Sequence, residues 1–122
     1  MGTFQQTIEV AAAPGGPFIA LDAMVDTGSL YTWVPASVLR RLGVTPRERR
    51  TFVRADGTRI QRDVAWVEVR VGDQQAPTLC VFGDDGSSTL LGAFTLEGFG
   101  LAADPVNKRL VPMDVIPALT LR

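Results

Sequence analysis

The sequence contains no histidine and only one cysteine, Cys80. Ser-His-Asp triads, Cys-His pairs and most zinc sites require an imidazole, so the missing histidine excludes these chemistries. A single cysteine cannot form a disulfide within the chain, and its apolar neighbours in Thr78–Phe82 predict a buried thiol rather than a reactive one. Carboxylates are therefore the leading candidates for acid–base chemistry.

Long apolar runs are also missing from the chain. No stretch approaches the ~20 apolar residues that a membrane-spanning helix needs, and the N-terminus has no basic segment followed by an apolar one. We therefore expect no membrane partner and a cytoplasmic location. The formal net charge of -1 comes from acidic and basic residues mixed along the chain, so we expect no nucleic-acid partner either.

The sequence lacks a recognisable metal-binding loop as well. Asp84-Asp85-Gly86 has neither the alternating oxygen ligands nor the terminal glutamate of a calcium loop, and we interpret it as a solvated turn. We accordingly expect no metal and no other cofactor in the functional site.

What the sequence does contain favours a single all-β domain over residues 1–122. Its composition, with 46% hydrophobic and 20% charged residues, is close to that of globular domains. Glycine and proline punctuate short segments rich in β-branched and aromatic residues, a pattern typical of many short strands. The expected strands are Thr7–Ala11, Phe18–Val25, Thr78–Phe82 and Ser88–Gly92, followed by a hairpin over Leu101–Val111.

Two short helices and one long hairpin are expected among these strands. Pro35–Leu42 predicts a helix because proline is favoured at the first helical position, and Ala93–Glu97 predicts one further helical turn stopped by Gly98. Thr51–Val71 predicts a hairpin in which Asp56-Gly57 forms a two-residue turn between the strands.

The apolar strand at Phe18–Val25 runs directly into Asp26-Thr27-Gly28. Ser29 follows, and Trp33-Val34-Pro35 comes a few residues later, so the segment resembles the active site of pepsin-like aspartic peptidases. Leu90-Leu91-Gly92 resembles the element that crosses behind the catalytic loop in that family. The length corresponds to one subunit rather than to a two-lobed pepsin. The chain thus resembles the single-lobed, retropepsin-like aspartic peptidases of clan AA, of the small prokaryotic type.

This resemblance implies an all-β fold, a closed acid-protease β-barrel with one or two short helices. It also implies a catalytic loop in which Asp26 carries the carboxylate, Thr27 hydrogen-bonds across a two-fold axis, and Gly28 presents its N–H to the carboxylate. The hairpin from Thr51 to Asp63 lies where the family places its substrate-covering flap. Substrate binding is therefore expected at the flap tip, formed by Ala55, Asp56, Gly57 and Thr58.

Hydrolysis by an aspartic dyad needs two close carboxylates that share one proton, one acting as base toward water and the other as acid toward the scissile carbonyl. The chain has one Asp-Thr-Gly, since Asp56-Gly57-Thr58 has the wrong order. Asp22 cannot be the second carboxylate either, because it lies roughly 13 Å from Asp26 along the same strand. Asp26 of a second copy is the economical source of the partner. We therefore expect a homodimeric aspartic endopeptidase that acts on peptide or protein substrates.

The expected flap departs from the family pattern, since its tip lacks the tyrosine of pepsin-like enzymes and the glycine-rich sequence of retroviral ones. It carries Asp56 instead, a further carboxylate near the cleft. Two other functions stay open: a retropepsin-fold peptide-binding or dimerisation module with little or no catalysis, and a domain that acts only inside a larger assembly. Trp33 and Trp66 could line the cleft or belong to the core, and either Val115–Leu121 or Thr3–Val10 could build a dimer interface.

Overall fold

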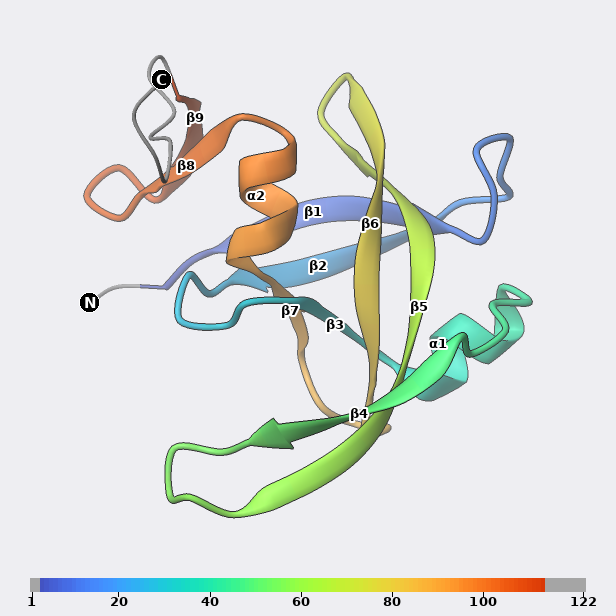
Figure 1. The fold of residues 1–122 in the computed structure, drawn as a ribbon. Coiled ribbons are helices and arrows are strands. Elements are labelled where there is room, and N and C mark those ends of the chain that lie inside the picture. Colours follow the sequence, from blue (N-terminus) through green and yellow to red (C-terminus); the bar gives the residue numbers. More distant parts are fainter. Residues whose placement is uncertain (1–2, 114–122) are drawn as a thin grey trace, which may run out of the picture.

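The computed structural model describes residues 3–113, whose strands form one closed sheet and a separate hairpin (Figure 1). The main sheet has the strand order β1-β2-β7-β3-β6-β5-β4, and β1 additionally pairs with β5. This additional pairing closes six of the seven strands into a barrel and leaves β4 as an extension outside it. In chain order, the elements are β1 (Gln5–Ala11), β2 (Ile19–Val25), β3 (Thr32–Pro35), α1 (Ala36–Arg41), β4 (Glu48–Val53), β5 (Arg59–Val71), β6 (Gln74–Gly83), β7 (Thr89–Leu91), α2 (Ala93–Gly98), β8 (Leu101–Asp104) and β9 (Arg109–Pro112).

The barrel closes where the C-terminal part of β1 meets the C-terminal part of β5, with Glu9 opposite Arg70 and Ala11 opposite Glu68. Closure pairs strand edges that would otherwise be open to other chains. The expected all-β, closed β-barrel with one or two short helices is confirmed, and both helices are present. Neither helix within residues 3–113 is long and apolar enough to cross a membrane.

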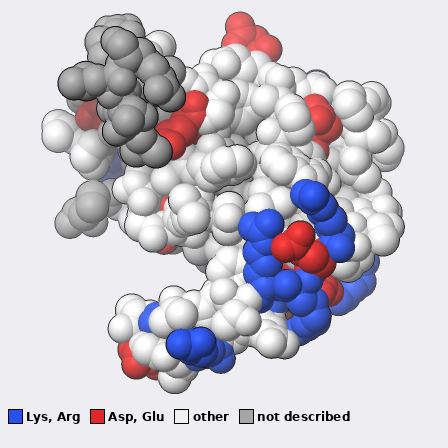
Figure 2. Space-filling view, in the orientation of Figure 1, with Lys and Arg blue, Asp and Glu red and all other residues white. Residues whose placement is uncertain are grey.

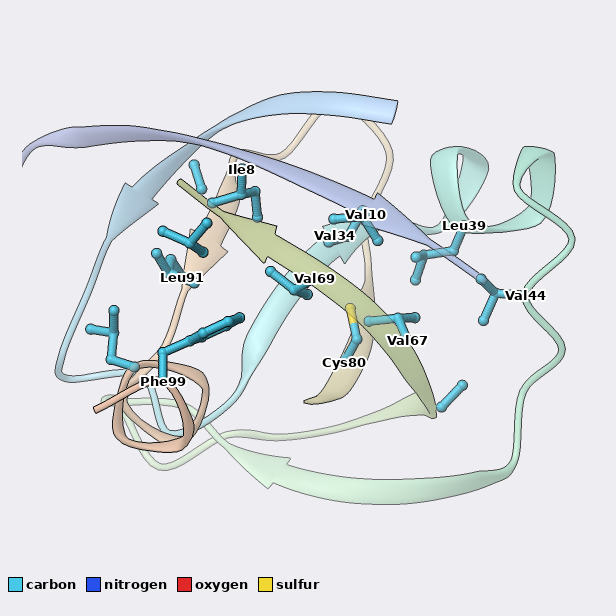
Figure 3. Close-up of a cluster of buried hydrophobic side chains, with 14 of the residues drawn as sticks. Ile8, Val10, Val34, Leu39, Val44, Val67, Val69, Cys80, Leu91 and Phe99 are labelled. Carbon is cyan, nitrogen blue, oxygen red and sulfur yellow. The ribbon is translucent and has the colours of Figure 1, made fainter. Parts of the chain in front are cut away.

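Alternating apolar side chains fill the interior of the barrel. Val67, Val69 and Val71 are buried at every second position of β5, and Ile8 and Val10 are buried in the same way on β1. Each such side chain contributes about 1.5–3 kcal/mol to folding by leaving water. Figure 3 shows Ile8, Val10, Val67 and Val69 converging with side chains from neighbouring elements, among them Val34, Leu39, Val44, Cys80, Leu91 and Phe99.

Cys80 belongs to this core, as its apolar neighbours predict. The residue is completely buried, and burial raises the pKa of its thiol to about 12. The thiol therefore stays protonated at neutral pH and packs as a small apolar group, which leaves it without a role in nucleophilic chemistry.

The first helix begins after Pro35, and the prediction that Pro35 starts it is wrong by one residue. Pro35 is still the last residue of β3, with φ −52° and ψ 136°, so its backbone is extended and helical geometry begins at Ala36. At the other end, Gly43 adopts a φ of +82°, and the Val44 N–H donates to the Leu39 carbonyl over 2.9 Å. This left-handed glycine ends the helix after about two turns.

The second helix, α2, includes Gly98, the residue expected to stop it, and the chain turns instead at Gly100 with a φ of +66°. From there β8 and β9 form the hairpin that the sequence predicts. The Met113 N–H donates to the Gly100 carbonyl over 2.8 Å and so ties the end of this hairpin to the end of α2. The segment Val115–Leu121, a candidate for a dimer interface, lies outside the described residues.

The hairpin of β4 and the first half of β5 projects from the barrel (Figure 1). The expected two-residue turn at Asp56-Gly57 is wrong, because it would need a positive φ at both residues and Asp56 does not have one. Instead, the Arg54 carbonyl accepts from the Gly57 N–H over 2.9 Å, and the Arg54 N–H donates to the Thr58 carbonyl over 2.8 Å. Ala55 and Asp56 therefore form the centre of the turn, and Gly57, at φ +88°, takes the left-handed position after it.

Candidate active site

Strand β2 delivers Asp26 to the end of the barrel, where the chain leaves the sheet. β2 runs parallel to β7, with Val25 beside Leu91, and the Asp26 N–H donates to the Leu91 carbonyl over 3.0 Å. The Ser29 N–H then donates to the Asp26 carbonyl over 3.1 Å and closes a tight loop. The backbone of Asp26 is therefore held on both sides, while its side chain is half-buried at the end of the strand.

The carboxylate of Asp26 is oriented by its own loop. The Gly28 N–H donates to Asp26 Oδ1 over 3.0 Å, which is the contact that the motif predicts. A Cβ on residue 28 would lie 3.2 Å from that same oxygen, closer than nearly all real contacts, so a side chain here would press on the carboxylate. Thr27 is exposed and lies beside a hollow of about 330 Å³ that also reaches Phe4 and Pro105.

Gly92 crosses directly behind this loop, at the junction of β7 and α2. The Ala93 N–H donates to the Ser29 carbonyl over 2.9 Å, and the Phe94 N–H donates to the Leu30 carbonyl over 2.8 Å. A Cβ on Gly92 would lie 2.3 Å from the carbonyl oxygen of Tyr31, a distance that no side chain tolerates. The loop can therefore rest on β7 and α2 only because residue 92 has no side chain.

Three buried threonines support the crossing on its core side, and no motif in the sequence predicts this role for them. The Gly92 N–H donates to Thr32 Oγ1 over 3.1 Å; Thr32 Oγ1 lies 2.6 Å from Thr95 Oγ1, which lies 2.8 Å from Thr78 Oγ1. Their sequence signal is weak, because threonine is also an ordinary strand residue. In the folded chain their hydroxyls satisfy one another in the core and join β3, β6 and α2 under the Asp26 loop.

Asp26 faces a cleft of about 720 Å³ between its loop, the projecting hairpin and the loop after β6. Figure 2 shows the surface hollowed between the hairpin and the body of the molecule. The volume is in the range that binds sizeable ligands. The cleft is lined by Asp26, Gly28, Ser29, Leu30, Tyr31, Trp33, Phe52, Val53, Arg54, Ala55, Ile60, Arg62, Asp84, Ser87, Ser88 and Leu90.

Of the four flap residues expected to bind substrate, only Ala55 lines this cleft. Asp56 Oδ1 instead accepts from the Thr58 N–H over 2.9 Å and from Thr58 Oγ1 over 2.7 Å, and these bonds hold the pKa of Asp56 below its ordinary value. Gly57 sits in the turn beside them. The carboxylate of Asp56 is thus used to build the turn, and the hairpin faces the cleft mainly through Phe52–Ala55 and Ile60.

The two tryptophans lie in different places. Trp33 is half-buried, lines the cleft, and packs against Phe52 of the hairpin with ring centroids 5.2 Å apart. Trp66 is 46% exposed and lies outside the cleft, beside α2, so neither the core nor the cleft interpretation holds for it. Through Phe52, which lies near the tip of the hairpin, Trp33 joins the hairpin to the strand that follows the Asp26 loop.

Three other carboxylates, which could be mistaken for partners of Asp26, have partners of their own. Asp22 accepts from Thr7 Oγ1 over 2.9 Å on the exposed side of β2. Asp84, at the rim of the cleft, forms an ion pair with Arg62: Arg62 Nη2 donates to Asp84 Oδ2 over 3.1 Å and lies 3.0 Å from Oδ1. Asp85 accepts from the Ser37 N–H over 2.9 Å, which lowers its pKa. Among residues 3–113, no three metal-ligating side chains gather into a group that could hold a metal ion.

The barrel, the Asp-Thr-Gly loop at the end of β2 and the glycine crossing behind it define a retropepsin-like aspartic peptidase fold of clan AA, in its single-lobed form. The chain belongs to the family described as "gag-polyprotein putative aspartyl protease", whose model matches residues 19–97. The matched segment contains the Asp26 loop, the projecting hairpin and Gly92.

A solved structure supports the same fold. The solution structure of Simian Foamy Virus (mac) protease superimposes with a TM-score of 0.56, covering 78% of this chain and 93% of that chain at 19% sequence identity. At this identity the likeness concerns the fold alone. No curated protein sequence matches the chain.

Proposed function

We propose that the protein is an aspartic endopeptidase that hydrolyses peptide bonds with a water molecule activated by two Asp26 carboxylates, one from each of two identical subunits. The observation that carries this proposal is the placement of Asp26. Its carboxylate accepts from the Gly28 N–H and faces a cleft of about 720 Å³ beside a projecting hairpin.

The chemistry follows from two carboxylates sharing one proton. The ionised carboxylate removes a proton from water as the water attacks the scissile carbonyl, and the protonated carboxyl donates its proton to the carbonyl oxygen. Close carboxylates hold one proton between them because ionising both would place two like charges side by side. Asp26 alone cannot perform both roles in one step.

Among the described residues, Asp84 is the only other carboxylate that lines this cleft. Asp84 pairs with Arg62, however, and lies at the other end of β3. Both carboxylates can be placed along β3. Asp26 lies beyond the Trp33 end, because Leu90 of β7 pairs with Trp33 and the next residue of β7 contacts the Asp26 backbone. Asp84 lies beyond the Pro35 end, because Gly83 pairs with Pro35 and Asp84 follows it. The two carboxylates are therefore separated by roughly 10 Å or more of strand, too far to share a proton.

A symmetric dimer would supply the missing group. A two-fold axis beside Thr27 would bring two Asp26 loops face to face, because such an interface uses the same surface on both subunits. Thr27 is exposed and free to hydrogen-bond across that axis. Of the candidate interface segment Thr3–Val10, the part Gln5–Ile8 pairs with β2 alone and so keeps one open edge, whereas Glu9 and Val10 pair on both sides.

Incubation of the protein with a diverse peptide library across pH tests this function. We expect cleavage with a bell-shaped, acid-shifted pH profile, because the reaction needs a single proton on the Asp26 pair. Chelators such as EDTA should leave the rate unchanged, since the proposed reaction uses no metal. Saturable peptide binding without cleavage at any pH would instead assign the chain a peptide-binding role, and cleavage abolished by EDTA would contradict the dyad.

The hairpin should act as a flap over the bound peptide. Replacing Gly57 with valine is expected to reduce peptide turnover with little change in thermal midpoint, because valine disfavours the φ of +88° and the site has open space around it. Steady-state kinetics and thermal melts measure the two effects.

Gly72→Val is the matched control for this flap prediction. Gly72 has a φ of +61° and open surroundings, but it lies in the turn between β5 and β6, outside the cleft. It should carry a similar backbone cost and leave turnover intact. Equal losses of turnover in the two variants would show that the β4–β5 hairpin has no special role in catalysis.

A further inference from the structure

Tyr31, the single tyrosine of the chain, lies in the cleft just after the Asp26 loop. Its ring packs edge-on against two others: Phe52 of β4, at a centroid distance of 6.2 Å, and Phe94 of α2, at 6.0 Å. Its carbonyl accepts from Ser29 Oγ over 2.8 Å. Tyr31 is thus held in place by the loop, the hairpin and the helix together.

Arg50 fixes the hydroxyl end of this side chain. Arg50 Nη1 donates to Tyr31 Oη over 3.0 Å, and Arg50 Nε donates to Glu48 Oε2 over 2.7 Å. Arg50 and Phe52 are two residues apart on β4, so they share the face of the strand that looks toward Tyr31. The bond to Glu48, and then the one to Tyr31, raise the pKa of Arg50 above its ordinary value.

The direction of this hydrogen bond leaves the phenolic proton available. A tyrosine hydroxyl both accepts and donates, and here its oxygen accepts from a guanidinium that can only donate. Among the described residues, no hydrogen bond has Tyr31 Oη as its donor. Accepting from a cation also polarises the O–H and makes it a better donor. Tyr31, which lines the cleft, therefore carries a hydroxyl that Arg50 holds in place and that keeps its proton for donation.

We propose that Tyr31 is a substrate-binding residue whose hydroxyl donates a hydrogen bond to a backbone carbonyl of an extended peptide in the cleft, and that Arg50 is the positioning residue for that hydroxyl. This inference rests on the proposed peptide-cleaving function. A backbone carbonyl fits the donor because an extended peptide offers one at every residue, independent of side-chain sequence. The contact would therefore favour peptides in general over any particular sequence.

The test compares Tyr31→Phe with the parent on the best-cleaved library peptide. Phenylalanine keeps the ring contacts and removes only the hydroxyl. We expect KM to rise about 3- to 10-fold, the effect of losing one neutral hydrogen bond. The value of kcat should stay nearly unchanged, because this bond is present in both the ground state and the transition state. Arg50→Gln should raise KM in the same direction. In the Tyr31→Phe background, however, Arg50→Gln should have no further effect, because Arg50 acts through the hydroxyl.

Arg49→Gln is the matched control. Arg49 is the neighbour of Arg50 on β4, points to the opposite side, pairs with Asp63 over 3.1 Å and lies outside the cleft. It should leave KM unchanged. Additive effects of Arg50→Gln and Tyr31→Phe, or an equal rise in KM for Arg49→Gln, would overturn the positioning role of Arg50. An unchanged KM for Tyr31→Phe would overturn the inference as a whole.

A binding arm separates this inference from the proposed function. Calorimetry measures the peptide affinity of two proteins, the Asp26→Asn variant and the Asp26→Asn, Tyr31→Phe double variant. Both are tested on the same peptide. If the parent cleaves no peptide, library peptides selected for binding are used. Binding weakened about 3- to 10-fold in the double variant supports the role of Tyr31 even if the parent proves inactive. Equal binding by the two proteins, or no saturable binding of any peptide, overturns it.

Discussion

Replacing Asp26 with asparagine is expected to lower peptide turnover by about 10²- to 10⁴-fold, the range of general acid–base catalysis. The amide has nearly the same shape as the carboxylate, but it neither accepts a proton from water nor shares one with a partner. Its oxygen can still accept from the Gly28 N–H, which reaches Asp26 Oδ1 over 3.0 Å in the parent. The fold should therefore survive, and initial rates together with thermal melts measure both outcomes.

Asp22→Asn is the control for this experiment. Asp22 lies on the same strand, is exposed and, among residues 3–113, accepts only from Thr7 Oγ1 over 2.9 Å. Its replacement should leave turnover at the parent level. Full activity in Asp26→Asn would move the chemistry to another group, and an equal loss in Asp22→Asn would indicate that any charge removed from β2 has the same effect.

Gly92→Ala should have the second largest effect, on stability and turnover together. The added Cβ would lie 2.3 Å from the Tyr31 carbonyl oxygen and 2.9 Å from that of Ser29, both of them backbone atoms. Either β7 and α2 or the Asp26 loop must move. We expect the free energy of unfolding to fall by about 1–3 kcal/mol, as it does for overpacked cores. Turnover should fall about 10²-fold, because displacing catalytic groups by about 1 Å has an effect of that size.

Gly98→Ala provides the matched comparison for Gly92→Ala. Gly98 ends α2 only six residues further along, and a Cβ there meets no atom within 4 Å. Alanine should be neutral or stabilise the helix by up to about 1 kcal/mol, with turnover unchanged. Denaturant unfolding and kinetics on both variants check the pair. A Gly92→Ala protein as stable and active as the parent would contradict the close crossing.

The Asp26 loop could be predicted from the sequence because its signals are local. An apolar strand leads directly into Asp26-Thr27-Gly28, and the role of the Gly28 N–H depends on residues two positions apart. The crossing at Gly92 is expected from the resemblance of Leu90-Leu91-Gly92 to the family element that passes behind the catalytic loop. The number and spacing of the strands predict an all-β fold, the resemblance to the family implies that it closes into a barrel, and the pairing of β1 with β5 completes that barrel.

The rest of the site depends on contacts that no local pattern contains. Tyr31 and Arg50 are 19 positions apart, and Thr32 and Thr95 are 63 apart, so only the folded barrel brings them together. Asp56-Gly57 predicts the centre of the turn at the tip of the hairpin, yet Thr58 supplies both donors to Asp56, and the turn lies one residue earlier. Neighbouring side chains, rather than residue preferences, decided each of these features.

The central claim, that each active site needs Asp26 from two subunits, is tested most directly by mixing parent and Asp26→Asn protein at constant total concentration. If subunits exchange and both carboxylates are required, activity should follow the square of the parent fraction, so an equal mixture should retain about one quarter of the parent rate. Activity that falls in direct proportion to the parent fraction, to about one half in an equal mixture of freely exchanging subunits, would show that a single Asp26 suffices and would contradict the two-subunit site.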